Sequence, residues 1–307
     1  MRNIQSKFLG GMVGSALGDA IGEIAFVYPQ KDILCSRLDQ LSEFRYTDDT
    51  AMAIGLAESI INQERIDEQH LGNTFSDNFD REPWRGYAPG PPTIFAQVKQ
   101  GGIAYSRAAQ RLFGGQGSLG NGAAMRIVPV GLFFHNHTDL YELACASAKV
   151  THAHPVGMDG AAIQAFAVAS AVKLDPEKKF QTDAFAKNMI GVAKTYEMRE
   201  KMAVVQQLIA KDVAPDIAAD RIGRTVAVHE SMPFAIYSFL RNCQSFEKCL
   251  FCAILNGGDR DTLGAMAGAI SGAYLGIEAI AEPLRQKLEN RNYIEHLASS
   301  LAKMVAL

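Results

Sequence analysis

The sequence lacks the long apolar segments and the excess of one charge that mark membrane and nucleic-acid-binding proteins. No stretch approaches the roughly 20 apolar residues that span a bilayer, and the best candidate, 265–277, consists mostly of glycine and alanine. The first residues contain no apolar signal core. The 30 basic side chains are balanced by 33 acidic ones, so no general cationic surface is available for a phosphate backbone. We therefore expect a cytoplasmic protein that binds neither membrane nor nucleic acid.

Cysteine is scarce as well. The five cysteines are odd in number and thinly spread, so they do not describe a disulfide framework, and a reducing compartment fits them. Cys249 and Cys252 form a C-x-x-C pair, but no second pair accompanies it. The apolar residues around them predict a buried helix in which cysteine acts as a small hydrophobic side chain.

Two histidine pairs also lack the partners that a zinc site needs. His135 and His137 form one pair, His152 and His154 the other, with no cysteine or further histidine nearby in sequence. Surface or hydrogen-bonding roles are therefore predicted. His152 is singled out, because the segment around it interrupts two predicted helices and is expected to line a cavity.

The alternation of apolar and polar residues that marks β-strands is nearly absent. Apolar or small residues instead recur at spacings of three and four, which predicts helices. The segments with this pattern are 49–62, 139–150, 160–172, 182–196, 230–242, 246–255 and 261–280. In contrast, glycines and prolines break up 83–122, which is predicted to be a loop region of the kind that often carries function. The fold class is therefore predicted to be all-α.

The length of 307 residues allows two domains or one large core. The most polar linking segment, 174–182, could join two domains or simply two helices. We favour a helix connection, because related motifs lie on both sides of it and have to meet in one site. The whole chain, 1–307, is then a single domain.

Two short acidic clusters are the most informative motifs. Thr47-Asp48-Asp49-Thr50 and Asp259-Arg260-Asp261-Thr262 each precede a predicted helix. Helix capping explains one carboxylate at each helix start. It does not explain two, because like charges at that spacing repel each other unless a cation or a donor compensates them. Carboxylate and hydroxyl oxygens suit Mg²⁺ or Mn²⁺, so paired caps and a two-metal site both remain open on spacing alone.

Glycine is abundant and concentrated in three places. The run Gly114-Gly115-Gln116-Gly117-Ser118-Leu119-Gly120-Asn121-Gly122 is either a flexible surface loop or a cradle whose backbone N–H groups bind a pyrophosphate. Small residues also recur at spacings of three and four along 265–276, and Gly14, Gly18 and Gly22 follow a similar spacing. Because glycine in a helix costs up to about 1 kcal/mol relative to alanine, the first of these stripes predicts a central helix with a neighbouring backbone pressed against it.

Taken together, these motifs resemble those of the ADP-ribosylglycohydrolase family, in order over nearly the whole chain. Segments 229–240 and 264–274 are most similar to the branch that acts on serine-linked ADP-ribose and poly(ADP-ribose). The motifs that carry the resemblance are Gly14-Ser-Ala-Leu-Gly18-Asp19-Ala-Ile-Gly22, Tyr46-Thr47-Asp48-Asp49-Thr50-Ala-Met52, Gly120-Asn121-Gly122-Ala-Ala-Met125-Arg126, Thr151-His152, Glu230-Ser231-Met-Pro233 and Gly257-Gly258-Asp259-Arg260-Asp261-Thr262.

The resemblance implies a compact, single-domain orthogonal helical bundle with two Mg²⁺ or Mn²⁺ ions at its centre. It also implies that a carboxylate assists the attack of water on the distal ribose, the role expected of Asp48, Asp49, Asp261 or Glu23. By the same resemblance Phe113 stacks on adenine, and His152 contacts the nucleotide. The implied metal ligands are Thr47, Asp48, Asp49, Asp259, Asp261 and Thr262, and the implied phosphate and ribose contacts are Gly117, Ser118, Leu119, Gly120, Asn121 and Gly122.

Three positions depart from the family pattern. Phe26 stands where a glutamate usually shields the metals, so Glu23 or a metal-bound aspartate is expected to take over that role. Arg260 replaces a threonine between the two aspartates, where its cation could offset carboxylate charge or turn outward toward a phosphate. Leu119 replaces an aromatic residue beside the adenine.

The resemblance implies a metal-dependent, monomeric hydrolase that releases ADP-ribose from modified protein side chains, whether the linkage is to serine, to arginine or within poly(ADP-ribose). Two alternatives remain. One is a catalytically impaired ADP-ribose binder or structural relative, which Phe26 and Arg260 motivate. The other is a hydrolase of small derivatives such as O-acetyl-ADP-ribose.

Overall fold

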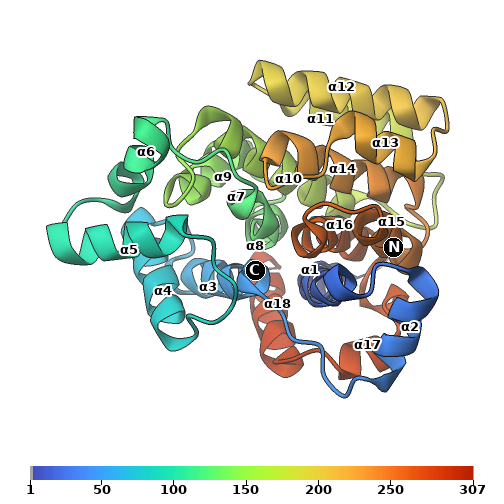
Figure 1. The fold of residues 1–307 in the computed structure, drawn as a ribbon, viewed down its shortest axis with the longest axis horizontal. Helices are drawn as coiled ribbons and strands as arrows, with labels where there is room; N and C mark the ends of the chain where they lie inside the picture. The colour runs from blue at the N-terminus through green and yellow to red at the C-terminus, as the bar shows by residue number, and fades with distance from the viewer. Residues whose placement is uncertain (1–2, 307) are drawn as a thin grey trace.

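The computed structural model describes residues 3–306 and contains helices joined by short connections (Figure 1). No named strand occurs within that range, which confirms the all-α prediction. The helices are α1 (Ile4–Val27), α2 (Lys31–Gln40), α3 (Asp48–Gln63), α4 (Glu68–Arg81), α5 (Gly90–Gly101), α6 (Tyr105–Gly115), α7 (Gly122–Met125), α8 (Val128–Phe133), α9 (Leu140–Lys149), α10 (Pro155–Lys173), α11 (Thr182–Val192), α12 (Tyr196–Ala210), α13 (Pro215–Ile222), α14 (Val228–Arg241), α15 (Phe246–Leu255), α16 (Arg260–Leu275), the 3-10 helix η1 (Ile277–Ala279), α17 (Glu282–Gln286) and α18 (Arg291–Val305).

The centre of the fold is an antiparallel pair of helices, α1 and α16, which lie side by side in the middle of Figure 1. Their glycines face one another: a Cβ added to Gly18 would lie 2.0 Å from the carbonyl oxygen of Gly264, and one added to Gly14 would lie 2.5 Å from that of Gly268. Because no side chain separates the backbones, the two helices approach as closely as the stripe of small residues predicts. The start of α16, with its acidic cluster, is therefore anchored in the core.

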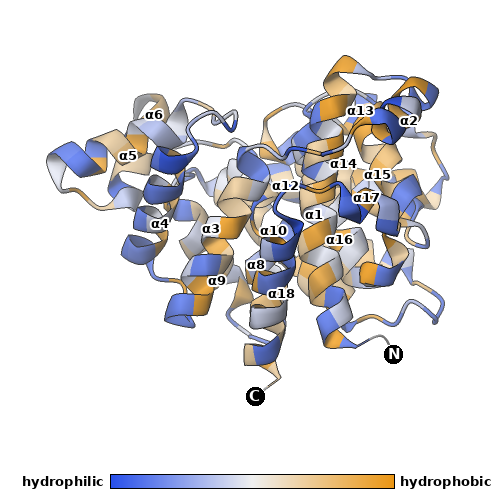
Figure 2. Cartoon of the chain, turned by 90° about the horizontal axis from the view of Figure 1, so that it is seen from below, coloured by the Kyte–Doolittle hydropathy of each residue, from blue (hydrophilic) through white to orange (hydrophobic). Residues whose placement is uncertain are grey.

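The remaining helices surround this pair. In Figure 1, α4, α5 and α6 form one side of the molecule and α11 to α14 the opposite edge. Figure 2 shows hydrophilic residues on peripheral helices such as α4 and α18 and more hydrophobic colouring on α14 and α15. By length and composition α10 is also apolar enough to cross a bilayer, but 78% of its most apolar window is buried inside the fold, as in the core helix of a globular protein.

The prediction of one loop region over 83–122 is wrong in part, because two helices, α5 and α6, form inside it. Prolines precede and open α5, where the fixed backbone angle of proline suits the first turn and its missing N–H costs nothing. Gly102, with φ of 59°, ends the same helix. Here the glycines and prolines mark the ends of helices. Residues 82–89 and the glycine-rich run after Leu112 do remain irregular.

The predicted helix 182–196 is divided into α11 and α12 by a buried carboxylate. Asp159 of α10 accepts hydrogen bonds from the backbone N–H groups of Lys194 and Thr195, at 3.0 Å and 2.6 Å, and from the Thr195 hydroxyl. These bonds hold the chain extended between the helices. The connection 174–182 joins α10 to α11, as predicted, and Cys249 and Cys252 lie buried and unpaired on α15.

Two isolated β-bridges hold segments next to the acidic clusters. Phe44, shortly before the first cluster, pairs with Leu288, and Gly120 pairs with Ala227 at the start of α14. The segment before Ala227 also contacts the second acidic cluster. There the backbone N–H of Asp259 donates to the carbonyl of Arg224 at 2.9 Å. Segments far apart in sequence are thus fixed around one region of the fold.

Candidate active site

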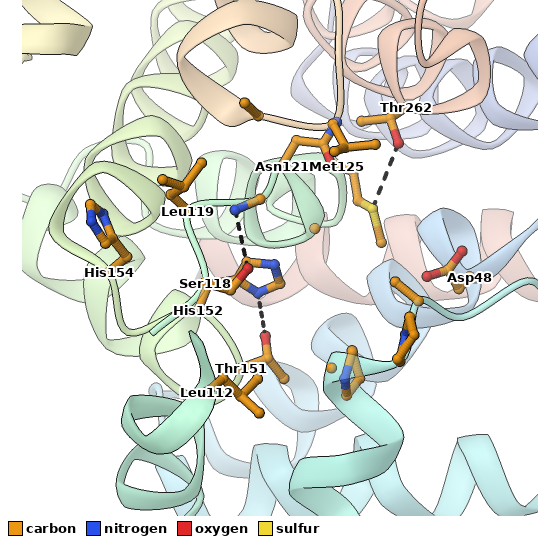
Figure 3. Close-up of a pocket in the computed structure, with 18 of the residues that line it drawn as sticks. Asp48, Leu112, Ser118, Leu119, Asn121, Met125, Thr151, His152, His154 and Thr262 are labelled. Atoms are coloured by element: carbon orange, nitrogen blue, oxygen red, sulfur yellow. Dashed lines mark hydrogen bonds between the residues drawn. The ribbon is translucent and has the colours of Figure 1, made fainter. Parts of the chain in front are cut away.

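Both acidic clusters and the glycine-rich run open into one cavity of about 710 Å³. Figure 3 shows Asp48 and Thr262 on one side of this cavity and Leu119 and His154 on the other. Of the predicted site residues, the cavity is lined by Asp48, Asp49, Asp259, Asp261, Thr262, Phe113, Gly117, Ser118, Leu119, Gly120, Asn121, Gly122 and His152. Thr47 and Glu23 do not line it.

The first cluster forms the start of α3. Thr47 is the N-cap, and its hydroxyl accepts a hydrogen bond from the backbone N–H of Asp49 at 3.4 Å. Capping therefore occupies the threonine and leaves the two aspartates for another role. Asp49 is buried, 2% exposed, and its Oδ1 has no hydrogen-bond partner. A buried carboxylate oxygen without a partner is costly, so this atom marks a place for a donor or a cation.

The second cluster lies where α16 begins. Asp259 precedes the helix and accepts a hydrogen bond from the Asn121 side chain at 2.7 Å. Asp261, in the first turn, accepts one from the backbone N–H of Thr262 at 2.8 Å. The Asn121 amide also donates to Ser231 at 3.1 Å, so it joins the glycine-rich run, α14 and the second cluster.

Burial, and then repulsion between neighbouring carboxylates, raises the pKa values of Asp48, Asp49 and Asp261. Burial and the neighbouring Asp19 raise the pKa of Asp48 to about 7. Burial and Asp259 raise the pKa of Asp261 to about 8. Burial, followed by Asp261, raises the pKa of Asp49 well above its usual value. Raised pKa values in one cavity are typical of functional sites, and a bound cation would reverse them.

The chemistry of this donor set fits divalent cations. Carboxylate oxygens, including those of Asp48 and Asp261 with their raised pKa values, line the same cavity as a threonine hydroxyl and the unpartnered Oδ1 of Asp49. Within residues 3–306, however, no three histidine, cysteine, aspartate or glutamate side chains gather closely enough to hold an ion as they stand. Binding would therefore draw the carboxylates together, which their mutual repulsion otherwise opposes.

The glycine-rich run forms the floor of the cavity between the clusters and α10. Gly117 has a φ of 76°, and a Cβ there would lie 2.7 Å from the backbone nitrogen of His154, so only glycine fits. A Cβ at Gly122 would lie 2.8 Å from the imidazole of His152. The loop is then fastened to the segment that leads into α14, because the N–H of Asn121 donates to the carbonyl of Val226 at 2.9 Å. It is a fixed cradle and not a free surface loop.

His152 supports this cradle from below (Figure 3). Its side chain is 7% exposed, and its Nδ1 lies 2.8 Å from the hydroxyl of Thr151. Burial, together with the nearby Arg126 cation, lowers the pKa of His152 to about 3, so the imidazole is neutral at physiological pH. A neutral ring can present its second nitrogen to a ligand without adding charge.

The far end of the cavity is apolar and open. Phe113 is 70% exposed and adopts the left-handed conformation, with a φ of 51°, which is rare for a bulky residue. Leu119 and Val226, which also line the cavity, are exposed as well. Strained backbone and exposed aromatic side chains of this kind are typical of ligand-binding sites.

The structure also shows where the departures from the family pattern lie. Arg260 turns away from the carboxylates and donates to the carbonyl of Ile254 near the end of α15. It therefore caps a helix and takes no part in the cavity lining. Glu23 and Phe26 are exposed on α1, and Glu23 affects Asp261 only through its charge.

Comparison with known proteins agrees with this geometry. A family model described as ADP-ribosylglycohydrolase matches residues 1–306. The chain belongs to the ADP-ribosylglycohydrolase family. It is 32% identical to ADP-ribosylhydrolase ARH3 of Bos taurus over 97% of this chain and 93% of that protein, and 33% identical to that of Xenopus tropicalis over 94% and 92%. A solved structure titled ADP-ribosylglycohydrolase-related protein complex shares the fold, with a TM-score of 0.74 at 22% identity over 99% of this chain and 100% of that chain.

Family membership makes the chain a glycohydrolase. Two residues of this ADP-ribosylglycohydrolase site were not predicted as functional. Asp19, fully buried on α1, accepts hydrogen bonds from the hydroxyls of Thr47 and Thr50 at 2.8 Å and 2.6 Å. It ties the central helix to the first acidic cluster. Its place in the motif 14–22, one of those that carry the family resemblance, was the sequence signal.

Arg126 is the second such residue. It is fully buried, donates to the carbonyl of Gly122 at 2.8 Å, and lies 4.9 Å from the Phe75 ring. Burial lowers its pKa to about 9, while the charge of Asp48 partly opposes that shift. This cation under the cradle provides positive charge where the sequence has no basic patch.

The raised carboxyl pKa values predict a pH-dependent stability. Between the ordinary aspartate pKa of about 4 and values near 7 for Asp48 and 8 for Asp261, the folded protein binds more protons than the unfolded chain. Its metal-free stability should therefore fall as pH rises through this window. In EDTA, the melting temperature should decrease from about pH 5 to about pH 8, and Mn²⁺ should restore it most at the higher pH. Melting curves of wild type and Asp261→Asn check this. Equal slopes in EDTA would contradict it.

Proposed function

We propose that this glycohydrolase is a divalent-cation-dependent hydrolase of the bond between the distal ribose of ADP-ribose and a protein side chain. One observation supports this proposal above all: a single cavity has carboxylates from two helix starts at one end and a glycine cradle with an exposed aromatic ring at the other. The groups of ADP-ribose follow a matching order, with a reactive ribose at one end, a pyrophosphate in the middle and an adenine at the other end.

The residues that would hold two Mg²⁺ or Mn²⁺ ions come from both clusters. Asp48, Asp49, Asp259 and Asp261 supply carboxylates, as the donor chemistry of the cavity favours. Thr262 contributes a hydroxyl within the cavity, whereas Thr47 is also engaged with Asp19. When bound, such ions neutralise the carboxylates and polarise the ribose hydroxyls and a water molecule.

The nucleotide end would be bound by backbone donors, by one aromatic ring and by one aliphatic side chain. The cradle, residues 117–122, would direct backbone N–H groups at the pyrophosphate. Phe113 stacks on the adenine, with Leu119 as an aliphatic wall on the same cavity. Arg126 beneath the cradle supplies a buried positive charge.

The hydrolytic step forms a bond from the oxygen of water to the anomeric carbon of the distal ribose and breaks the bond from that carbon to the acceptor. A carboxylate takes the proton of the water, and the acceptor leaves with a proton. Asp48 and Asp261 line the cavity and are the carboxylates that we propose for this transfer. Glu23 lies outside the cavity lining, so its part in activating water stays a prediction to be tested.

Serine-linked ADP-ribose and poly(ADP-ribose) are the substrates we propose first, on the resemblance of segments 229–240 and 264–274. Arginine-linked ADP-ribose and O-acetyl-ADP-ribose are the competing substrates. A silent ADP-ribose binder is the alternative from another class, and the exposed Phe26 in place of a glutamate favours it.

A matrix of metals and linkages tests the function. Purified protein is assayed with Mg²⁺, Mn²⁺ or EDTA for release of ADP-ribose from serine-linked, arginine-linked, polymeric and O-acetyl substrates. Release from the serine-linked or polymeric substrate, abolished by EDTA, is the expected result. Glu23→Ala is run alongside and is expected to retain activity if cavity carboxylates activate the water. ADP-ribose binding without release from any substrate would favour the silent binder.

A further inference from the structure

The side chain of Arg85 is almost completely enclosed, although it lies outside the cavity. It belongs to the strap, which we define as residues 82–89 between α4 and α5, and its side chain is 5% exposed. Nε and Nη2 donate to the Glu82 carboxylate, both at 3.0 Å. Nη1 and Nη2 donate to Glu289, at 2.7 Å and 3.0 Å. Nη1 also donates to the carbonyl of Tyr46 at 3.1 Å, so every N–H of the guanidinium is used.

The Tyr46 carbonyl is the informative acceptor, because it belongs to the peptide group that leads into the first acidic cluster. The nitrogen of the same peptide, that of Thr47, donates to the Asp19 carboxylate at 3.0 Å. One peptide group is thus held at its oxygen by Arg85 and at its nitrogen by Asp19. This fixes the direction in which the chain enters Thr47, Asp48 and Asp49.

Arg85 also sets the cavity wall opposite Asp48. The next residue of the strap, Gly86, lines the cavity, and a Cβ added to it would lie 3.9 Å from Oδ1 of Asp48. The strap that Arg85 anchors therefore borders the Asp48 carboxylate at Gly86. The φ of Gly86, 87°, allows the strap to turn at this point.

The third partner, Glu289, connects this arrangement to the segment before α18. The backbone N–H of Phe44 donates to the carbonyl of Lys287 at 2.6 Å, and the N–H of Glu289 donates back to the carbonyl of Phe44 at 3.0 Å. The Asn290 side chain donates to the Tyr46 hydroxyl at 2.8 Å. The Arg85 guanidinium lies 4.1 Å from the centre of the Tyr46 ring, so Tyr46 is held at its backbone, its ring and its hydroxyl.

Such a buried charge network adds little net stability, because removing the ions from water offsets most of their attraction. What it supplies is geometry, since a planar guanidinium with five fixed donors orients several acceptors at once. We propose that Arg85 is a positioning residue that holds Asp48 and the strap in register for cation binding. This inference rests on the proposed function of the cavity, and it assigns a role to a side chain that touches neither the cations nor the substrate.

The test is Arg85→Lys, which keeps the charge and loses the planar fork. Titration calorimetry with MnCl₂ should show the Kd for Mn²⁺ rising by about 10- to 100-fold, as for other residues that orient metal ligands. Turnover at saturating Mn²⁺ should fall while KM changes little, because the nucleotide end of the cavity is unaffected. A folded Arg85→Lys protein whose Mn²⁺ affinity stays within about twofold of the wild-type value would overturn the proposal.

Arg291→Lys is the matched control. Arg291 is also ion-paired in this part of the fold, to Glu282 at 2.8 Å and Glu295 at 2.7 Å, but it contacts neither the strap nor the acidic cluster. It should leave the Mn²⁺ affinity unchanged. If Arg85→Lys fails to fold, Glu289→Gln takes its place, since it removes one carboxylate of the network and should weaken Mn²⁺ binding in the same direction.

Cation binding and hydrolysis are measured separately, so the two proposals can fail separately. Weaker Mn²⁺ binding by Arg85→Lys supports the positioning role even if none of the ADP-ribosyl substrates is cleaved. Cleavage by wild type together with unchanged Mn²⁺ affinity in Arg85→Lys overturns the positioning role alone. A wild-type protein that binds neither Mn²⁺ nor Mg²⁺ overturns both.

Discussion

Replacement of Asp48 by asparagine should lower the rate of ADP-ribose release by about 10³-fold or more, the loss expected when a group that stabilises developing charge is removed from an enclosed site. Asp48 lines the cavity, and Thr47, not Asp48, caps α3. The helix therefore does not need this carboxylate as a cap, and the carboxylate contributes only a small interaction with the helix dipole. The melting temperature of the metal-free variant should be equal to or above that of wild type, because repulsion from Asp19 is relieved.

The matched control for this variant is Asp32→Asn. Asp32 is exposed in the first turn of α2, just as Asp48 lies in the first turn of α3, so both carboxylates interact with a helix dipole. Turnover by the Asp32 variant should remain at the wild-type level. Initial rates and circular dichroism of both variants decide the matter. Loss of helical structure in Asp48→Asn would instead favour a capping role for the first cluster.

The second large effect is on stability. Replacement of Gly268 by alanine should destabilise the fold by about 3 kcal/mol or more, at or above the upper end of what an overpacked core position costs. The added Cβ would lie 2.1 Å from the carbonyl oxygen of Gly14. A backbone atom inside a helix cannot rotate away as a side chain can, so α1 and α16 would have to separate. Urea unfolding of the purified protein measures this change.

Gly191→Ala provides the control for the same chemical change in a helix. Gly191 lies in α11, and no atom lies within 4 Å of a Cβ added to it. This variant should be neutral or more stable by up to about 1 kcal/mol, because alanine has the higher helix propensity. A Gly268→Ala protein as stable as Gly191→Ala would show that the two central helices can move apart at little cost.

The two effects are connected through α16. Its first turn carries Asp261, and Asp259 immediately precedes it. A forced separation of α1 from α16 would move this cluster relative to Asp19 and the start of α3. The folded fraction of Gly268→Ala should therefore also bind Mn²⁺ more weakly than wild type, although Gly268 does not line the cavity.

The sequence by itself determined the features that depend on local pattern and residue type. Period-three and period-four spacing predicted the helices, and the end of α15 at Leu255 matches the predicted end. The stripe of small residues predicted the close contact between α16 and a neighbouring backbone. The acidic clusters and the glycine-rich run were predicted to meet, and both line one cavity. These features are readable because each is set by residues within one or two helical turns.

Only the tertiary structure decided which side chains support that cavity and which do not. It placed Glu23 outside the lining and turned Arg260 back toward α15. It brought Arg85 and Asp19, 66 positions apart in the chain, to opposite ends of one peptide group beside Asp48. Such pairings leave no periodic trace in a sequence, because they depend on helix packing that brings distant segments together, and a buried charge is positioned by whichever donors and acceptors that packing supplies.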